Sequence, residues 1–367
     1  MRRLKVLTIT CSNAANYGAR LQACALAEWL RSEGHDASVI DYRPWYMRNN
    51  AGLRLWGVPF RHVLSGLRNY GYMRNYRRRL RRFAEFSEKY IPLTPRAYMS
   101  AQELADNPPS ADAIIAGSDQ IWNVSMANGS DPAFFLRFAD SGCRRISYAA
   151  SIAIPEIPAA AAAPLRDNIA TFDHVSVREE SGARIVESLG LPRPQVTVDP
   201  VFLLPGSYWE SMAAATPVKG KYILVYDFMR SRELQQAALR LKRLTGARII
   251  NVGARRLRYA DRNFLNASPQ EFLGLLRGAD CVLSNSFHGS VFAMIFGIDF
   301  LVVDREDGLN ERMRALLQRY GLEQRLIGSA APDSSLTAHI DYTALRSRLE
   351  KDIASSKEFL RTALLHE

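Results

Sequence analysis

Residues 4–40 read LKVLTITCSNAANYGARLQACALAEWLRSEGHDASVI and predict one complete βαβ unit. Residues 4–10 form an apolar run typical of a buried strand, residues 21–30 carry apolar side chains at helical spacing, and residues 37–40 indicate the next strand. Gly34 lies where the C-terminal cap of the helix is expected. Units of this kind assemble into a parallel sheet with helices on its faces.

The same alternation recurs in two series along the chain. Strand-like runs follow at residues 113–116, 146–149, 175–177 and 196–198, and then at 222–226, 247–252, 281–283 and 300–303. The turn signal Pro205-Gly206 separates the two series. We therefore predict an α/β fold of two doubly wound Rossmann-like domains, residues 1–205 and 206–340, with a C-terminal helix at 341–367. The active site is expected in the cleft between the domains, where the carboxyl ends of strands from both halves face one ligand.

Length and composition indicate a folded enzyme. The chain has 367 residues, of which 47% are hydrophobic and 23% charged, so a disordered or fibrous protein is not expected. No cleavage-like site follows the first apolar run, and no stretch reaches the roughly 20 apolar residues that span a bilayer, so we expect a cytoplasmic protein. No metal or other cofactor is expected, because the cysteines lack the close spacing of metal ligands; they are Cys11, Cys24, Cys143 and Cys281.

The net charge of +11 favours an anionic partner. Much of the excess lies at residues 61–82, inside a predicted helical insertion at about 45–100, and this helix is expected to be basic nearly all round. A solvated surface helix and a contact with anionic lipid or a lipid-linked pyrophosphate at the inner membrane face are both open. Nucleic acid is not expected, because no recognition module accompanies the arginines.

Polar side chains follow several predicted strands at the point where each strand ends. Asn16 and Gly18 lie in the turn after the first strand, where backbone N–H groups at a helix start can bind an anion. After the strand at 113–116 come groups that suit sugar hydroxyls, namely Gly117, Ser118, Asp119 and Gln120. An ordinary βα turn is the alternative at both places.

Arg178 directly follows the strand at 175–177, which places a guanidinium at the edge of the sheet where ligands bind. There it could hold a carboxylate or phosphate with two parallel hydrogen bonds. An interdomain ion pair that involves Glu179 or Glu180 is the alternative.

The most informative segment is 284–290, SNSFHGS, between a predicted strand and a helix. It places the imidazole of His288 at a helix N-terminus, beside Ser286 and Phe287, and Gly289 relieves crowding around it. Histidine can transfer protons near neutral pH, and the helix dipole disfavours its charged form. The other five histidines have no comparable setting, so His288 is our candidate catalytic residue.

In their order along the chain these segments resemble the polysaccharide pyruvyl transferase family. The resemblance extends over roughly residues 4 to 327, and each motif alone is weak, whereas the set in this order is specific. The matching pieces are Asn16-Tyr17-Gly18-Ala19 with Leu21-Gln22, Gly117 to Asn123, Ser176-Val177-Arg178-Glu179 with Ser181-Gly182, Asp199-Pro200, Ser286-Phe287-His288-Gly289, and Asn310-Glu311-Arg312 with Gly321-Leu322-Glu323.

The resemblance implies a fold like that of GT-B glycosyltransferases, with an acceptor-side N-terminal and a donor-side C-terminal domain. It implies transfer of pyruvate from phosphoenolpyruvate to a sugar of an exopolysaccharide, or of its lipid-linked precursor, as a cyclic ketal. His288 matches the catalytic histidine and Arg178 the donor-binding arginine. Many members carry Arg-Leu-His where this chain has Ser286-Phe287-His288, so Arg305, Arg312 or the Gly18 turn is expected to hold the donor phosphate.

Two other functions are compatible with the same residues. A GT-B glycosyltransferase that uses a nucleotide sugar is one, because fold alone does not determine function. A non-catalytic partner that binds glycan or lipid is the other.

Overall fold

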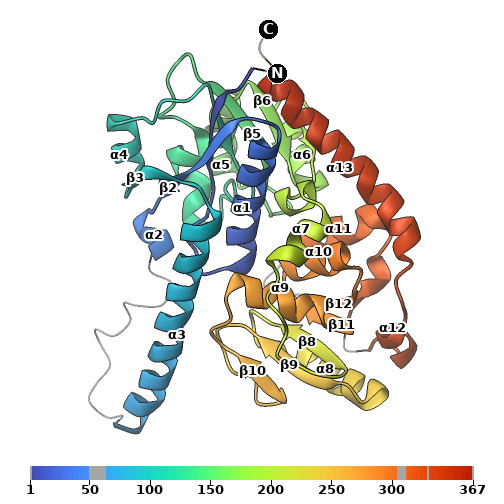
Figure 1. Ribbon diagram of the computed structural model, residues 1–367. Coiled ribbons are helices and arrows are strands. Elements are labelled where there is room, and N and C mark those ends of the chain that lie inside the picture. Colours follow the sequence, from blue (N-terminus) through green and yellow to red (C-terminus); the bar gives the residue numbers. More distant parts are fainter. Residues whose placement is uncertain (1, 49–62, 304–310, 329, 366–367) are drawn as a thin grey trace.

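The computed structural model describes residues 2–48, 63–303, 311–328 and 330–365, and within them the chain forms two parallel sheets (Figure 1). The first sheet has the order β3-β2-β1-β4-β5-β6-β7 and the second the order β10-β9-β8-β11-β12-β13. The strands of the first are β1 Lys5–Ile9, β2 Asp36–Tyr42, β3 Leu93–Tyr98, β4 Ala113–Ala116, β5 Arg144–Ala150, β6 His174–Val177 and β7 Gln195–Val196. Those of the second are β8 Tyr222–Tyr226, β9 Arg248–Val252, β10 Arg262–Phe264, β11 Cys281–Ser284, β12 Asp299–Val303 and β13 Leu326–Ile327.

Helices connect the strands and cover both sheets, so the prediction of two doubly wound sheets is confirmed. They are α1 Tyr17–Ser32, α2 Trp45–Arg48, α3 Val63–Tyr90, α4 Ala101–Asp106, α5 Ala159–Ile169, α6 Glu180–Ser188, α7 Gly206–Met212, α8 Arg232–Thr245, α9 Pro269–Arg277, α10 Phe287–Phe296, α11 Glu311–Tyr320, α12 Asp333–Thr337 and α13 Tyr342–Leu364. Short 3₁₀ helices lie at Ala127–Ser130, Pro132–Phe135, Pro200–Leu203 and Glu323–Arg325. No helix within the described ranges is long and apolar enough to cross a membrane.

The first βαβ unit forms because its strands are apolar on both faces and its helix is capped. Val6 and Ile9 of β1 are fully buried, as expected for a central strand covered by helices on both faces. Helix α1 begins at Tyr17, four residues earlier than the apolar spacing indicated, because the side chain of Asn16 accepts a hydrogen bond from the Ala19 N–H at 3.3 Å.

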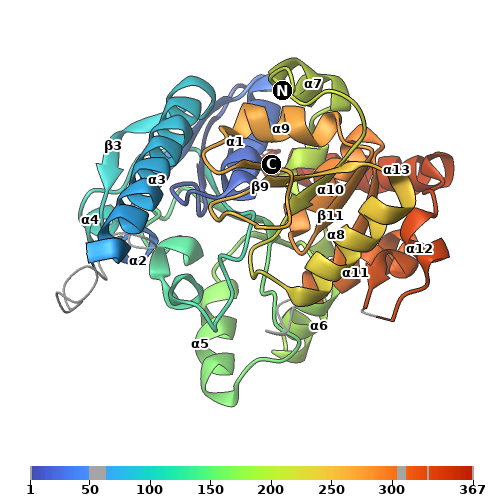
Figure 2. The ribbon, with the colours of Figure 1, turned by 90° about the horizontal axis from the view of Figure 1, so that it is seen from below.

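The two domains share an apolar core where α1 meets α9 and α10 (Figure 2). The ring of Tyr17 stacks on Phe272, with the ring centroids 4.2 Å apart and the planes at 4°. Its hydroxyl donates to the carbonyl of Ala267 at 3.0 Å. These contacts join the start of the N-terminal domain to the C-terminal one, and so hold the sheets in a defined arrangement.

The basic insertion differs from the prediction in two ways. It contributes a strand, β3, to the edge of the first sheet, and one face of its helix α3 is buried, the side chain of Arg79 included. Arg79 is buried, donates to the Tyr17 hydroxyl at 2.7 Å and lies 4.4 Å from the centre of that ring. Arg82 pairs with Glu271 of the C-terminal domain and donates to the carbonyl of Asn266. Part of the positive charge therefore stabilises the domain interface.

The C-terminal helix α13 contacts both domains rather than standing apart (Figure 1). Near its start, the Tyr342 hydroxyl donates to the carbonyl of Ile298 at 2.5 Å. Further along, the Ser356 hydroxyl accepts from the Val198 N–H at 3.0 Å, and Arg361 pairs at 2.7 Å with Glu33, the C-terminal cap of α1. The helix thus links the C-terminal domain to the N-terminal one.

Candidate active site

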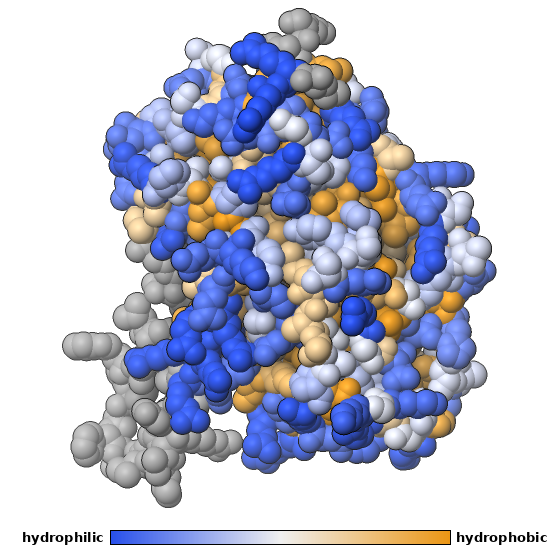
Figure 3. All heavy atoms as spheres, viewed as in Figure 1, coloured by the Kyte–Doolittle hydropathy of each residue, from blue (hydrophilic) through white to orange (hydrophobic). Residues whose placement is uncertain are grey.

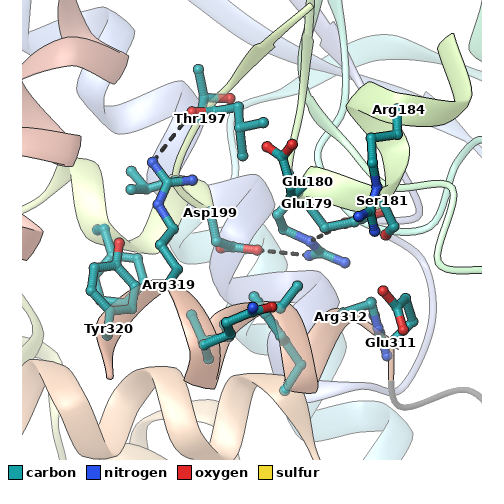
Figure 4. A pocket seen from close by; sticks show the side chains of 18 residues that line it. Glu179, Glu180, Ser181, Arg184, Thr197, Asp199, Glu311, Arg312, Arg319 and Tyr320 are labelled. Atoms are coloured by element: carbon teal, nitrogen blue, oxygen red, sulfur yellow. Dashed lines mark hydrogen bonds and ion pairs between the residues drawn. The ribbon is translucent and has the colours of Figure 1, made fainter. Parts of the chain in front are cut away.

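A pocket of ≈ 410 Å³ lies between the carboxyl edge of the first sheet and helix α11 (Figure 4). Its walls come from α6, from the chain around β7, from Phe287 at the start of α10, and from α11. Figure 4 shows Asp199 at its centre, with Arg319 and Tyr320 on one side and Arg184, Glu311 and Arg312 on the other. This volume falls in the range of small-molecule sites.

Arg178 lines the pocket and faces three carboxylates of its own domain. Its Nη1 lies 2.8 Å from Asp199 Oδ2, its Nη2 3.7 Å from Asp119 Oδ1, and its Nε 3.8 Å from Glu179 Oε2. Burial lowers the pKa of Arg178, and the charges of Asp199, Asp119 and Glu179 raise it by more. The alternative of an ion pair with Glu179 is therefore found, but the pair lies within the N-terminal domain rather than between the domains, and Glu180 pairs with Arg193 instead.

Asp199 is the buried centre of the charge cluster. It follows β7, and its Oδ1 accepts the Val201 N–H at 3.2 Å, which caps the short helix Pro200–Leu203. Burial raises the pKa of Asp199, but the adjacent His288 and Arg178 lower it by more, to about 2. The carboxyl group is thus ionised at neutral pH.

His288 is the second residue of α10, whose first turn is capped by the side chain of Ser286. Its Nε2 lies 3.3 Å from Asp199 Oδ2, close enough for an ion pair when the ring is protonated, but Nε2 has no hydrogen-bond partner among the described residues. The ring is only 7% exposed and is not part of the pocket wall, whereas the neighbouring Phe287 is. The structure therefore brings His288 and Arg178 to the same carboxylate oxygen, with Asp199 at the pocket surface.

The predicted anion-binding turn at Asn16 and Gly18 holds the histidine instead. A Cβ atom on Gly18 would lie 1.9 Å from Nδ1 and 2.2 Å from Cγ of His288, so the imidazole fills the space beside this glycine. Asn16 uses its side chain to cap α1. The turn is thus a capped helix start that packs against His288, and anion binding at this turn stays a prediction.

The predicted sugar-binding loop divides into an internal and an accessible half. A Cβ on Gly117 would lie 2.1 Å from the Tyr148 carbonyl oxygen, and Gly117 has a φ of +126°. Ser118 is fully buried, with its hydroxyl donating to the carbonyl of Ala149 at 2.6 Å. Asp119 and Gln120 are partly exposed, so they are the members of the loop that a ligand can reach.

Arg312 is the expected phosphate-binding alternative that the structure places at the site. Its Nη1 lies 3.7 Å from Asp119 Oδ1, and its guanidinium carbon lies 5.7 Å from the centre of the Phe287 ring. In the amide orientation that satisfies both ends of Gln120, the amide oxygen accepts from Arg312 at 3.0 and 3.1 Å. Arg305 lies outside the described residues, and Gly289 is buried within α10.

Several buried polar atoms near the pocket have no hydrogen-bond partner among the described residues. They are Nε and Nη2 of Arg178, Oε2 of Glu179, Oγ of Ser181 and Nε2 of His288. Buried polar groups are normally satisfied, so a local concentration of such atoms is typical of a site that completes its hydrogen bonds with a ligand.

Sequence reasoning missed Asp199 and Glu179 as site residues. Asp199 was visible as the first residue of Asp199-Pro200 after a strand, but no pattern linked it to His288. Glu179 accepts from Ser151 Oγ and from the N–H groups of Ile152 and Ala153, and it thereby orders the loop after β5 beside Arg178.

Across the described ranges, no three His, Cys, Asp or Glu side chains are grouped to hold a metal ion.

Comparison with known proteins adds a family and a fold. The family model described as polysaccharide pyruvyl transferase matches residues 16–307. Among solved structures, UDP-N-acetylglucosamine 2-epimerase from Rickettsia bellii aligns with a TM-score of 0.57 at 14% identity, covering 99% of this chain and 96% of that one. A glycosyltransferase involved in avilamycin A biosynthesis aligns at 0.50 and 10% identity, covering 98% and 97%.

A glycosyltransferase from Rickettsia africae likewise aligns with a TM-score of 0.50 at 10% identity, covering 98% of this chain and 99% of that one. At such low identity these structures establish only the fold, which is the expected GT-B-like architecture of two Rossmann-like domains. No curated protein matches the chain.

Proposed function

The chain belongs to the polysaccharide pyruvyl transferase family, and we propose that it transfers the pyruvyl group of phosphoenolpyruvate to a sugar as a cyclic ketal, with release of phosphate. The observation that carries the proposal is the meeting of Arg178 and His288, from different domains, at Asp199 on the wall of an interdomain pocket. The acceptor is a sugar of a polysaccharide or of its lipid-linked precursor. The reaction needs no cofactor and would take place in the cytoplasm.

Arg178 and Arg312 are the donor-binding residues in this proposal. Both guanidinium groups lie near the ring of Phe287, at 4.4 and 5.7 Å from its centre. Nε and Nη2 of Arg178 lack hydrogen-bond partners among the described residues and can donate to a carboxylate or phosphate. Arg312 is proposed to take the phosphate in place of the arginine that Ser286 replaces, and Arg184 and Arg319 add positive charge to the pocket wall.

His288 is the proposed acid and base. The protonated imidazole gives its proton to the methylene carbon of phosphoenolpyruvate, which makes C2 electrophilic, and a sugar hydroxyl attacks C2 and returns a proton to the imidazole. A second hydroxyl of the same sugar then forms the other C–O bond as the bond from C2 to the phosphate oxygen breaks. The proton of that hydroxyl leaves with phosphate. Nε2 is assigned to the transfer, because it lacks a hydrogen-bond partner among the described residues and faces the negative charge of Asp199.

The acceptor is proposed to lie on the side of Asp119 and Gln120. These are the partly exposed residues of the loop after β4, and they lie within reach of Arg312. A carboxylate and an amide can accept from and donate to the two hydroxyls that form the ketal.

The direct test incubates the full chain with phosphoenolpyruvate and a panel of p-nitrophenyl glycosides. Release of phosphate, together with a gain in acceptor mass of one pyruvic acid less one water, is the expected result. His288→Asn should lower the rate by about 10² to 10⁴-fold. His339→Asn, in an imidazole that is 89% exposed, is the matched control and should leave the rate unchanged.

The same assay tests Arg312 through the affinity for phosphoenolpyruvate. Arg312→Gln should weaken donor binding by about tenfold, the usual value of one charge-assisted hydrogen bond. Arg314→Gln, in an exposed residue of the same helix, should leave donor affinity unchanged. Release of a nucleotide from a nucleotide sugar in place of phosphate would favour a glycosyltransferase, and acceptor binding without either reaction would favour a non-catalytic partner.

A further inference from the structure

One carboxylate oxygen connects the two residues that the proposed reaction needs. Asp199 Oδ2 lies 2.8 Å from Arg178 Nη1 in its own domain and 3.3 Å from His288 Nε2 in the other. Its side chain is completely buried, and the Val201 N–H holds the second oxygen. The position of Asp199 is therefore set by the N-terminal domain, independently of His288.

Gly18 lies beside the Nδ1 side of the His288 ring, whereas Asp199 lies beside Nε2. The glycine lies in the first turn of α1, where alanine would stabilise the helix by roughly 1 kcal/mol. No positive φ requires glycine at this position. What a side chain would meet is His288, since a Cβ would lie 1.9 Å from Nδ1. The glycine is thus explained by the space that the ring occupies.

Gly18 and Asp199 both belong to the N-terminal domain, whereas His288 belongs to the C-terminal domain. The orientation of the ring is therefore a property of the assembled domain pair. Asp199 is among the residues that line the pocket, and the ring of His288 beside it is 7% exposed. A carboxyl group with a pKa of about 2 is a poor proton donor at neutral pH, which favours a role in orienting its neighbours.

We propose that Gly18 and Asp199 form a histidine socket, in which Asp199 is the positioning residue that orients His288 and Arg178 relative to each other. The role of the socket in catalysis rests on the proposed function. The position of the His288 ring between Gly18 and Asp199 rests on the structure alone. The socket is complete only when the two domains are closed on each other as they are here. Closure would then couple donor binding at Arg178 to the alignment of His288.

Nuclear magnetic resonance of the full chain with ¹³C-labelled histidine tests the socket without any turnover. The ring signal of His288 is assigned by its loss in His288→Asn. It should shift in both Gly18→Ala and Asp199→Asn. Gly206→Ala is the matched control, since Gly206 also begins a helix but its Cβ would meet nothing closer than 3.5 Å. An unshifted His288 signal in both socket variants would overturn the proposal.

Kinetics separates positioning from a merely structural role. In Asp199→Asn, Arg178 loses a neutralising neighbour, so the affinity for phosphoenolpyruvate should stay within about threefold of wild type or improve, while kcat for phosphate release falls about a hundredfold. If Asp199→Asn instead lowers donor affinity, kcat and the fraction of folded protein together, Asp199 only supports the fold. If the wild-type chain releases no phosphate, the proposed function fails, and the resonance experiment still decides the socket.

Discussion

The charges around Arg178 nearly cancel before any ligand binds. Arg178 and Arg312 face the carboxylates of Asp119, Glu179 and Asp199 at distances from 2.8 to 3.8 Å. A trianionic donor would therefore compete with these carboxylates for the same guanidinium groups. The long contacts at Asp119 and Glu179 are the ones a donor can replace, whereas the 2.8 Å contact with Asp199 is a hydrogen bond that has to persist for the socket to work.

The low pKa of Asp199 makes its contribution to stability dependent on pH. The folded value of about 2 lies below the ordinary value of 3.8, so the contribution is complete above about pH 4 and is lost as the pH falls through 2. The difference in free energy of unfolding between wild type and Asp199→Asn should shrink by about 2 kcal/mol between roughly pH 5 and pH 2.

Urea unfolding followed by circular dichroism at each pH measures this difference. Asp36→Asn, at an exposed carboxylate, is the matched control for the loss of one acidic side chain. A constant gap between wild type and Asp199→Asn would contradict the assigned pKa.

Helix α3 combines an interface face with an exposed basic face. Arg79, Phe83, Phe86 and Ser87 are buried and recur at helical spacing toward α1. On the other face the exposed arginines are Arg74, Arg77, Arg78 and Arg81, and Figure 3 shows hydrophilic side chains gathered over this helix. Contact of the exposed face with anionic lipid stays a prediction.

Vesicle sedimentation tests the exposed face of α3. Binding to phosphatidylglycerol vesicles should fall as salt rises, because the Debye length shortens to about 10 Å at 0.1 M. Replacing Arg74, Arg77, Arg78 and Arg81 by Gln should abolish most of the binding. The same change at four exposed arginines elsewhere, Arg232, Arg255, Arg256 and Arg258, is the control. Equal binding by the two variants, or insensitivity to salt, would leave α3 as a solvated surface helix.

At the scale of the molecule, α13 joins the last part of the chain to the N-terminal domain. The helix begins at Tyr342, and its last turns contact Glu33, the C-terminal cap of α1, and Arg144 of strand β5. Leu360 is completely buried in the shared core, whereas Leu365, one residue beyond the helix, is 48% exposed.

Leu360→Ala should therefore destabilise the protein by about 2 to 5 kcal/mol, since it leaves a cavity in the core. Leu365→Ala should change the free energy of unfolding little. Chemical unfolding of the two variants provides the measurement, and equal small effects would show that α13 does not stabilise the N-terminal domain.

The sequence by itself determined the succession of strands and helices, because the signals for them are local. The apolar run of β1, the cap at Asn16 and the spacing of α1 lie within about 30 residues of one another, and the same holds for β11 and α10. Strand β3 was missed, because an edge strand with half-exposed side chains carries a weak periodic signal and lies beside a long basic helix.

Only the tertiary structure decided what the candidate residues touch. The sequence singled out His288, Arg178 and Gly18 from their positions at strand ends, yet it left open whether Gly18 binds an anion or only forms a turn, and whether Arg178 binds the donor or a carboxylate of the protein. The contacts of His288 with Gly18 and Asp199 join residues far apart in the chain, and they exist only because the two domains close on each other. Local sequence patterns determine on which strand or helix a side chain lies. The packing of the two domains determines which residues that side chain contacts.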